Sequence, residues 1–155
     1  MKNKINISLL SLSLFFFSSC SKSISTAKEL DGRWKQIEAY ENGIKVPLFN
    51  GDSIDGVFVE NTEKFKNFII FNYYNKNTRL EMLLEYSKVN FNSNVARFTD
   101  ELETNSAGNF DITTNGKRLE IANDPELYSE IELNENLLVI SPFGNKKNKN
   151  VYSRE

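Results

Sequence analysis

The sequence predicts an all-β fold, an up-and-down antiparallel barrel of about eight to ten strands. Three observations predict it. Short segments carry an apolar residue at every second position, Asn-Gly dipeptides separate such segments, and a Gly-x-Trp element at residues 32–34 heads the first of them. The strand–helix alternation and Gly-rich loop of a nucleotide-binding domain are missing from the pattern. We therefore expect one barrel domain over residues 30–155.

The first 19 residues are typical of an export signal. Lys2 and Lys4 precede an apolar stretch at 5–17, and small residues then lead to Cys20, the only cysteine. This arrangement resembles the lipobox of bacterial lipoprotein precursors. One cysteine cannot form an internal disulfide, so we interpret Cys20 as the lipid attachment site and first mature residue. The alternative is an ordinary secretory signal beside an incidental cysteine.

Residues 20–29 are small and polar, with little to bury, and are predicted to form an unfolded tether between the membrane and the barrel. Ser21 replaces the Asp that retains many lipoproteins in an inner membrane. We therefore expect a chain anchored to the outer membrane through acylated Cys20 and facing the periplasm. Surface display is the alternative, because Ser21-Lys22 resembles the start of the surface-export signal of Bacteroidetes lipoproteins. That signal continues with an acidic pair, whereas this chain has Ser23-Ile24.

Three Asn-Gly dipeptides predict tight turns, at residues 42–43, 50–51 and 115–116, because both residue types tolerate positive φ. Between them, Thr78 to Tyr86 alternates apolar and polar side chains, which favours a strand, although its Leu, Glu and Met content is also typical of a helix. We predict a strand because neighbouring segments are strand-like. Residues 67–74 are apolar on both faces, so we expect one face to be covered.

The last third of the chain predicts a meander. Short segments of period two are separated by turns at 115–116, 123–125 and 134–136. The apolar positions of these segments are Phe110, Ile112, Leu119, Ile121, Ile131, Leu133, Leu138 and Ile140.

The Gly32-Arg33-Trp34 element, the strands of this meander and the closing Val151-Tyr152-Ser153-Arg154 together resemble the lipocalin-like lipoproteins of Bacteroidetes. The resemblance covers nearly the whole mature chain. It implies that Gly32, Trp34 and Arg154 close one end of the barrel, with Arg154 from the last strand lying over the Trp34 indole. A guanidinium stacked on an indole contributes about 0.5 to 2 kcal/mol.

Composition limits the chemistry. The chain has no histidine, and its one cysteine is assigned to acylation, so neither a Ser-His-Asp or Cys-His nucleophile nor a His- or Cys-based zinc site can form. We expect no enzymatic activity, no metal and no cofactor. Removing Lys2 and Lys4 with the signal leaves 17 basic against 21 acidic residues, a net charge of −4, which argues against a nucleic-acid partner.

Two interpretations of the function remain open from the sequence. The first is a barrel that holds a small hydrophobic ligand above Trp34. The second is a non-enzymatic envelope module with a filled barrel that binds a protein partner, through the apolar second face of residues 67–74. The expected ligand-binding residues are Trp34, Gln36, Glu38, Phe68, Ile70, Leu80, Met82, Leu84, Tyr86 and Phe110.

Gln36 and Glu38 share the side of Trp34 under strict alternation, so they could point polar groups toward a ligand. A β-bulge that turns Ile37 and Ala39 inward, or an open barrel mouth, is the interpretation that we favour. The lysine tract at residues 146–149 lies in the last hairpin, and we expect it to be a solvated loop rather than a membrane contact.

Overall fold

A computed structural model describes residues 22–49, 51–74, 77–92, 94–122 and 124–155. The predicted signal peptide, Cys20 and the first residues of the predicted tether lie outside these ranges. Eleven strands and two short 3₁₀ turns follow one N-terminal helix, and no helix among the described residues is long and apolar enough to cross a bilayer.

The elements have the following bounds: helix 22–30, β1 Gly32–Glu41, β2 Ile44–Val46, β3 Ser53–Ile54, β4 Val57–Glu60, η1 Thr62–Lys64, β5 Asn67–Tyr73, β6 Arg79–Asn92, β7 Val95–Thr113, η2 Thr114–Gly116, β8 Arg118–Ile121, β9 Asp124–Leu133, β10 Leu137–Pro142 and β11 Lys149–Arg154.

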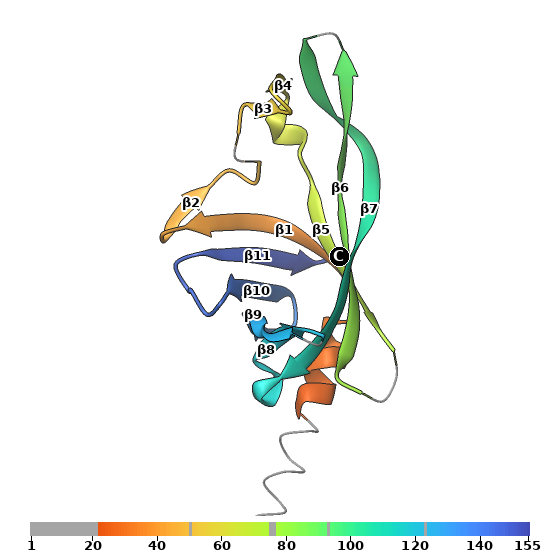
Figure 1. Cartoon of the computed structure of the whole chain (residues 1–155), viewed down its shortest axis with the longest axis vertical. Coiled ribbons are helices and arrows are strands. Elements are labelled where there is room, and N and C mark those ends of the chain that lie inside the picture. The colour runs from red at the N-terminus through yellow and green to blue at the C-terminus, as the bar shows by residue number, and fades with distance from the viewer. Residues whose placement is uncertain (1–21, 50, 75–76, 93, 123) are drawn as a thin grey trace, which may run out of the picture.

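Eight of these strands close into an antiparallel barrel, which confirms the predicted fold class. Strands β5 to β11 pair in sequence order, and β1 completes the ring by pairing with both β5 and β11. The strands that lie outside the ring are β2, which pairs with β1, and the β3–β4 hairpin, which joins the outer half of β7 (Figure 1).

The predicted tether is wrong where the structure describes it, because residues 22–30 form a helix packed against the barrel (Figure 1). Ser23, Thr26, Ala27 and Leu30 are buried, and their spacing places them on one helical face. Ser25 and Glu29, on the solvent side, hydrogen-bond at 2.8 Å. The small side chains on this face let the helix approach the barrel closely. Ala27 and Leu30 can therefore pack on the apolar core, although the segment as a whole is polar.

The main core fills the inside of the barrel. Each of the eight barrel strands contributes at least one buried side chain to it, and Ala27 and Leu30 of the helix join the same cluster. The largest fully buried members are Trp34, Phe71, Leu30, Leu80, Ile112 and Leu138. Burial of side chains of this size is worth about 1.5 to 3 kcal/mol each, so the interior packing is the main source of stability.

A second, smaller core lies outside the barrel. We call this part the outer lobe: β3, β4, η1 and the outer half of the β6–β7 hairpin, which extends beyond the barrel (Figure 1). Its buried residues are Val59, Ala96 and Phe98. Phe49 and Phe65 complete an aromatic trio with Phe98, with ring centroids 5.0 to 5.7 Å apart. Such pairs add about 0.5–1.5 kcal/mol beyond area burial.

The local predictions mostly hold. Asn42-Gly43 and Asn115-Gly116 are turns in which both residues have positive φ. Asn50 lies outside the described residues. Thr78 to Tyr86 falls almost wholly in β6, so the strand interpretation is confirmed and the helical one is wrong. Its propensity for helix is overridden because both edges of this segment pair with neighbouring strands.

Candidate functional site

The closed end of the barrel is assembled from the two ends of the described chain. Trp34 is fully buried, and its indole N–H donates to the carbonyl of Leu30 at 2.8 Å. Arg154 pairs with Trp34 across β1 and β11, and its guanidinium carbon lies 4.4 Å from the indole ring centroid. The structure therefore brings together the tryptophan and the arginine that the resemblance places there.

Arg154 also binds the end of the N-terminal helix. Its guanidinium donates to the carbonyl of Glu29, in the last turn of the helix, and to the carbonyl of Asp31, the residue that follows the helix. A cation here also suits the negative end of the helix dipole. Gly32 follows with φ of +120°, a conformation that L side chains rarely adopt, and lies beside the same guanidinium. The N-terminal helix, residues 22–30, therefore closes this end of the barrel and is held there by Trp34 and Arg154. We call this helix the helix plug.

Of the expected ligand-binding residues, four from β6 and β7 pack on the main core together with Trp34. Leu80 is fully buried, and Met82, Leu84 and Phe110 are partly buried against the same cluster. Tyr86 lies farther out and accepts a hydrogen bond from Asn105 at 2.6 Å. Leu80, Met82, Leu84 and Phe110 thus belong to the cluster that also contains Leu30 of the N-terminal helix.

Phe68 and Ile70 do not belong to this set, so their assignment to a pocket wall is wrong. Ile69 and Phe71, the alternate residues of β5, are the ones that enter the core. Phe68 lies under the guanidinium of Arg33, 3.8 Å from its ring centroid, and Arg33 is ion-paired with Glu85. Both faces of β5 are apolar, so alternation alone could not decide which one faces inward. A cation–π contact covers the outer face.

Gln36 is buried, and it is not turned into solvent. It accepts a hydrogen bond from Asn67 at 2.7 Å and donates one to Asn150 at 2.9 Å, which forms a chain of amides across β5, β1 and β11. The expected bulge is present between Gln36 and Glu38, but Ile37 points outward and is 40% exposed. The prediction that the bulge turns Ile37 inward is therefore wrong. Gln36 can be buried in its place because Asn67 and Asn150 satisfy the hydrogen bonds of its amide.

Glu38 lies beyond the bulge, on the rim of the barrel. Its carboxylate accepts hydrogen bonds from Lys45 at 2.6 Å and from Tyr40 at 2.8 Å. These two bonds, the one from Lys45 first, lower the pKa of the Glu38 carboxyl below its usual value. Glu38 is thus held by Lys45 of β2 and by Tyr40 of its own strand, and it does not belong to the core cluster.

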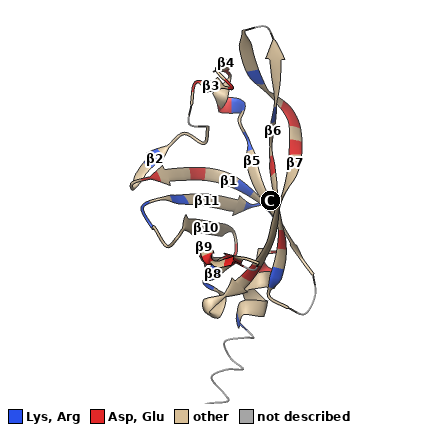
Figure 2. Cartoon of the chain, viewed as in Figure 1, with Lys and Arg blue, Asp and Glu red and all other residues tan. Residues whose placement is uncertain are grey.

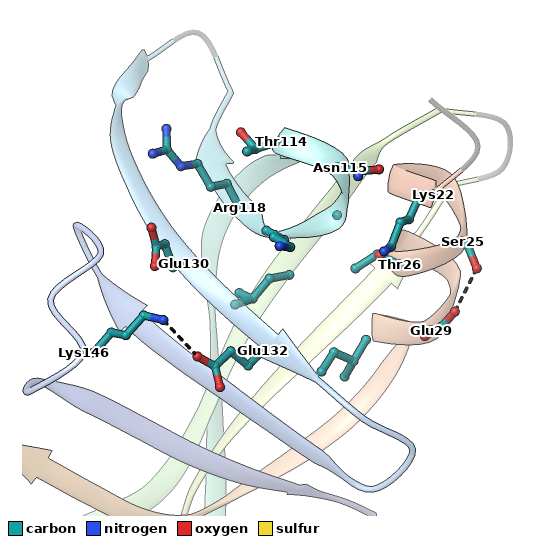
Figure 3. Close-up of a pocket in the computed structure, with 14 residues that line it drawn as sticks. Lys22, Ser25, Thr26, Glu29, Thr114, Asn115, Arg118, Glu130, Glu132 and Lys146 are labelled. Atoms are coloured by element: carbon teal, nitrogen blue, oxygen red, sulfur yellow. Dashed lines mark hydrogen bonds and ion pairs between the residues drawn. The ribbon is translucent and has the colours of Figure 1, made fainter. Parts of the chain in front are cut away.

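A cavity lies between the N-terminal helix and strands β8 and β9 (Figure 3). It is a cleft of about 720 Å³. Four cations and three carboxylates line it: Lys22, Lys117, Arg118, Lys146, Glu29, Glu130 and Glu132. Ile131 and Leu133 add apolar surface that is continuous with the main core. The cleft thus offers charges at its walls and an apolar floor.

Several of these charges already have partners. Lys146 is ion-paired with Glu132 at 3.5 Å, Glu29 is bound by Ser25, and the Arg118 guanidinium stacks 4.1 Å from the Tyr128 ring centroid. Within the described parts of the chain, the ammonium groups of Lys22 and Lys117 form no hydrogen bond or ion pair. The cleft therefore retains two ammonium groups for an anionic partner.

The helix wall of the cleft is fixed by η2. Gly116 has φ of +81°, and a Cβ there would lie 2.3 Å from the hydroxyl oxygen of Thr26. Only glycine allows this approach. The cleft was missed from the sequence because residues 22–29 were assigned to a tether; the spacing of Ser23, Thr26, Ala27 and Leu30 was the signal that could have found it.

Two smaller cavities lie at the rim of the barrel. One, of about 330 Å³, is bounded by the β1–β2 hairpin and residues 142 and 148–150. The other, of about 240 Å³, is mostly apolar and reaches Phe110 and Leu119 from the side of Leu127, Tyr128 and Phe143. None of the three cavities is lined by Trp34. Comparison of the chain with protein-family models, with curated proteins and with solved structures finds no match.

Proposed function

We propose that this chain is a lipid-anchored binding module of the cell envelope that works through its outer surface rather than through a ligand inside the barrel. The observation that carries the proposal is the main core, to which all eight barrel strands and the helix contribute buried side chains. The cleft between the helix and β8–β9 borders that core through Ile131 and Leu133. Ligand sites of proteins are typically concave and about 300–1,000 Å³, a range that includes this cleft.

The charges of the cleft specify the partner. Among the described residues of the cleft, Lys22 and Lys117 are the cations whose side chains have no hydrogen-bonded or ion-paired partner. Ile131 and Leu133 supply apolar surface. We therefore propose a partner that presents carboxylates beside an apolar group, such as an acidic segment of another envelope protein. The chain is assigned no enzymatic step.

The anchor is the second part of the proposal. The apolar stretch at 5–17 and the small residues before Cys20 support export and acylation, as in the lipocalin-like lipoproteins of Bacteroidetes that the strand pattern resembles. The proposed address is the periplasmic face of the outer membrane. Acyl chains contribute about 0.8 kcal/mol per buried CH₂, so Cys20→Ala is expected to move the protein from the membrane to the soluble fraction. A variant that stays in the membrane would contradict acylation of Cys20.

The cleft is tested on the soluble Cys20→Ala protein. We expect an acidic peptide that carries leucine and glutamate to raise the unfolding midpoint saturably, since a ligand that binds only the folded state stabilises it. Lys117→Glu should abolish this shift. Lys64→Glu, on η1 in the outer lobe, is the matched control and should retain it. An equal loss in both variants, or no shift with acidic peptides, would contradict the cleft.

A small-molecule carrier is the second candidate, and the 240 Å³ apolar cavity is the observation that favours it. Phe110, one of the expected ligand-binding residues, lines it. A short acyl or isoprenoid group would fit a cavity of this size, with its polar end at the barrel rim.

A further inference from the structure

Strand β7 has a long edge that no strand of the described residues covers. Strand β4 pairs with it over Val95 to Arg97, and β8 pairs with it over Phe110 to Thr113. Both strands lie on the side of β7 that is opposite β6. Between them, residues 98–109 have no strand on that side in the described parts of the chain. At about 3.3 Å per residue this opening is roughly 40 Å long.

The register shows which backbone groups face the opening. The Ser87 amide donates to the Lys66 carbonyl, so the backbone of Ser87 points toward β5 rather than toward β7. In an antiparallel ladder, backbone direction alternates along each strand, and residues opposite each other point both inward or both outward. Ser87 lies opposite Leu102, Glu85 opposite Thr104 and Leu83 opposite Ser106. The N–H and C=O groups of Leu102, Thr104 and Ser106 therefore face the opening.

At both ends of the opening, backbone groups of this edge already form hydrogen bonds with groups other than β6. At Phe98, the Asn61 side chain accepts from the backbone N–H and donates to the C=O, both at 3.0 Å, in place of a paired strand. At the other end, the amide of Ala122 donates to the Asn109 carbonyl at 3.0 Å. Between the irregularities of the β6–β7 ladder, residues 102–106 run in regular register. A strand of about five residues can pair there.

The charge of this edge selects the partner. Asp100, Glu101 and Glu103 are exposed along the open stretch, which Figure 2 shows as the acidic part of β7. Lys66 and Lys88 pair with two of these carboxylates, but the pairs are solvent-exposed and contribute little. Two copies of this edge would bring like charges together, which disfavours self-association.

We propose that residues 102–106 of β7 bind an extended, lysine- or arginine-rich segment of another protein by strand addition. The main-chain groups of Leu102, Thr104 and Ser106 provide the hydrogen bonds, and the carboxylates select basic side chains. This surface is separate from the helix–barrel cleft, which is lined by Lys22 and Lys117, and the two can fail independently.

The experiment follows the backbone amides of the soluble Cys20→Ala protein by NMR during titration with a ten-residue peptide of alternating lysine and valine. We expect hydrogen exchange at Leu102, Thr104 and Ser106 to slow by about tenfold or more at saturation. The same peptide with glutamate in place of lysine should have no effect. Failure of the basic peptide to protect these three amides would overturn the proposal.

Thr104→Pro is the backbone variant, because its N–H faces the opening and its loss leaves the β6–β7 ladder intact. It should abolish binding of the basic peptide while the folded spectrum is retained. If that variant does not fold, Glu101→Lys with Glu103→Lys replaces it and should reverse the preference to the acidic peptide. Unchanged preference would overturn the role of charge, and concentration-dependent dimers without peptide would assign the edge to a second copy instead.

Discussion

The closed end of the barrel and the outer lobe both bury apolar side chains at an end of the sheet, but they differ in how their cores are built. The closed end joins residues from the first and last parts of the described chain, with Leu30, Trp34 and Tyr152 in one cluster with the barrel core. The outer lobe has a core of its own, built on Val59, Ala96 and Phe98. The first is therefore inseparable from barrel folding, whereas the second can open while the barrel persists.

The largest expected effect concerns the helix plug. Leu30→Ala should lower the free energy of unfolding by about 2–5 kcal/mol, because the side chain is fully buried between helix and barrel. Urea unfolding of the soluble Cys20→Ala protein measures it. Lys28→Ala, on the exposed side of the same helix, is the control and should change stability by no more than about 0.5 kcal/mol. Equal midpoints for the two variants would mean that the helix does not dock.

The guanidinium over Trp34 should matter less. Arg154→Ala is expected to destabilise the fold by about 1–3 kcal/mol through lost stacking and packing on the indole, and it also releases the carbonyls of Glu29 and Asp31. The comparison is Arg97→Ala in the outer lobe, whose exposed ion pair with Glu60 should contribute about 1 kcal/mol or less. A larger loss for Arg97→Ala would reverse the ranking of the two regions.

Alkaline pH offers a third test. Burial raises the pKa of the Tyr152 hydroxyl above its usual value of 10.0. The unfolded chain therefore loses this proton first, so stability is complete below pH 10 and falls as the pH rises toward the folded-state pKa. We expect Tyr152→Phe to flatten the fall of the unfolding midpoint above pH 10. Tyr86→Phe, at a tyrosine outside the main core, is the control and should keep the slope. Equal slopes in wild type and Tyr152→Phe would contradict the burial of the Tyr152 hydroxyl.

The smallest effect on global stability is expected in the outer lobe. Phe98→Ala removes the ring that Phe49 and Phe65 contact. The free energy of unfolding of the barrel should change by less than about 1 kcal/mol, while hydrogen exchange in β4 and the outer half of β6–β7 becomes faster. Barrel and lobe amides that lose protection equally would show one cooperative unit instead of two.

The sequence predicted the barrel because its strands carry clear alternation and its turns carry Asn-Gly, which are local properties. Residues 22–30 were missed because small polar side chains on a helix face become buried only when a neighbouring element, here η2 with Gly116, approaches closely. Phe68 and Ile70 were assigned inward because both faces of β5 are apolar, and the deciding contact with Arg33 comes from another strand. Gln36 needed Asn67 and Asn150, which no local pattern connects to it.

The filled interior is the central claim, and Trp34, the only tryptophan, reports on it. The most direct measurement titrates the soluble Cys20→Ala protein with fatty acids, sterols and isoprenoids while Trp34 emission and the unfolding midpoint are followed together. Because the core already surrounds Trp34, we expect no ligand to change its emission saturably and raise the midpoint by mass action. An apolar ligand that produces both changes would show that the barrel opens around a ligand, and would contradict the account.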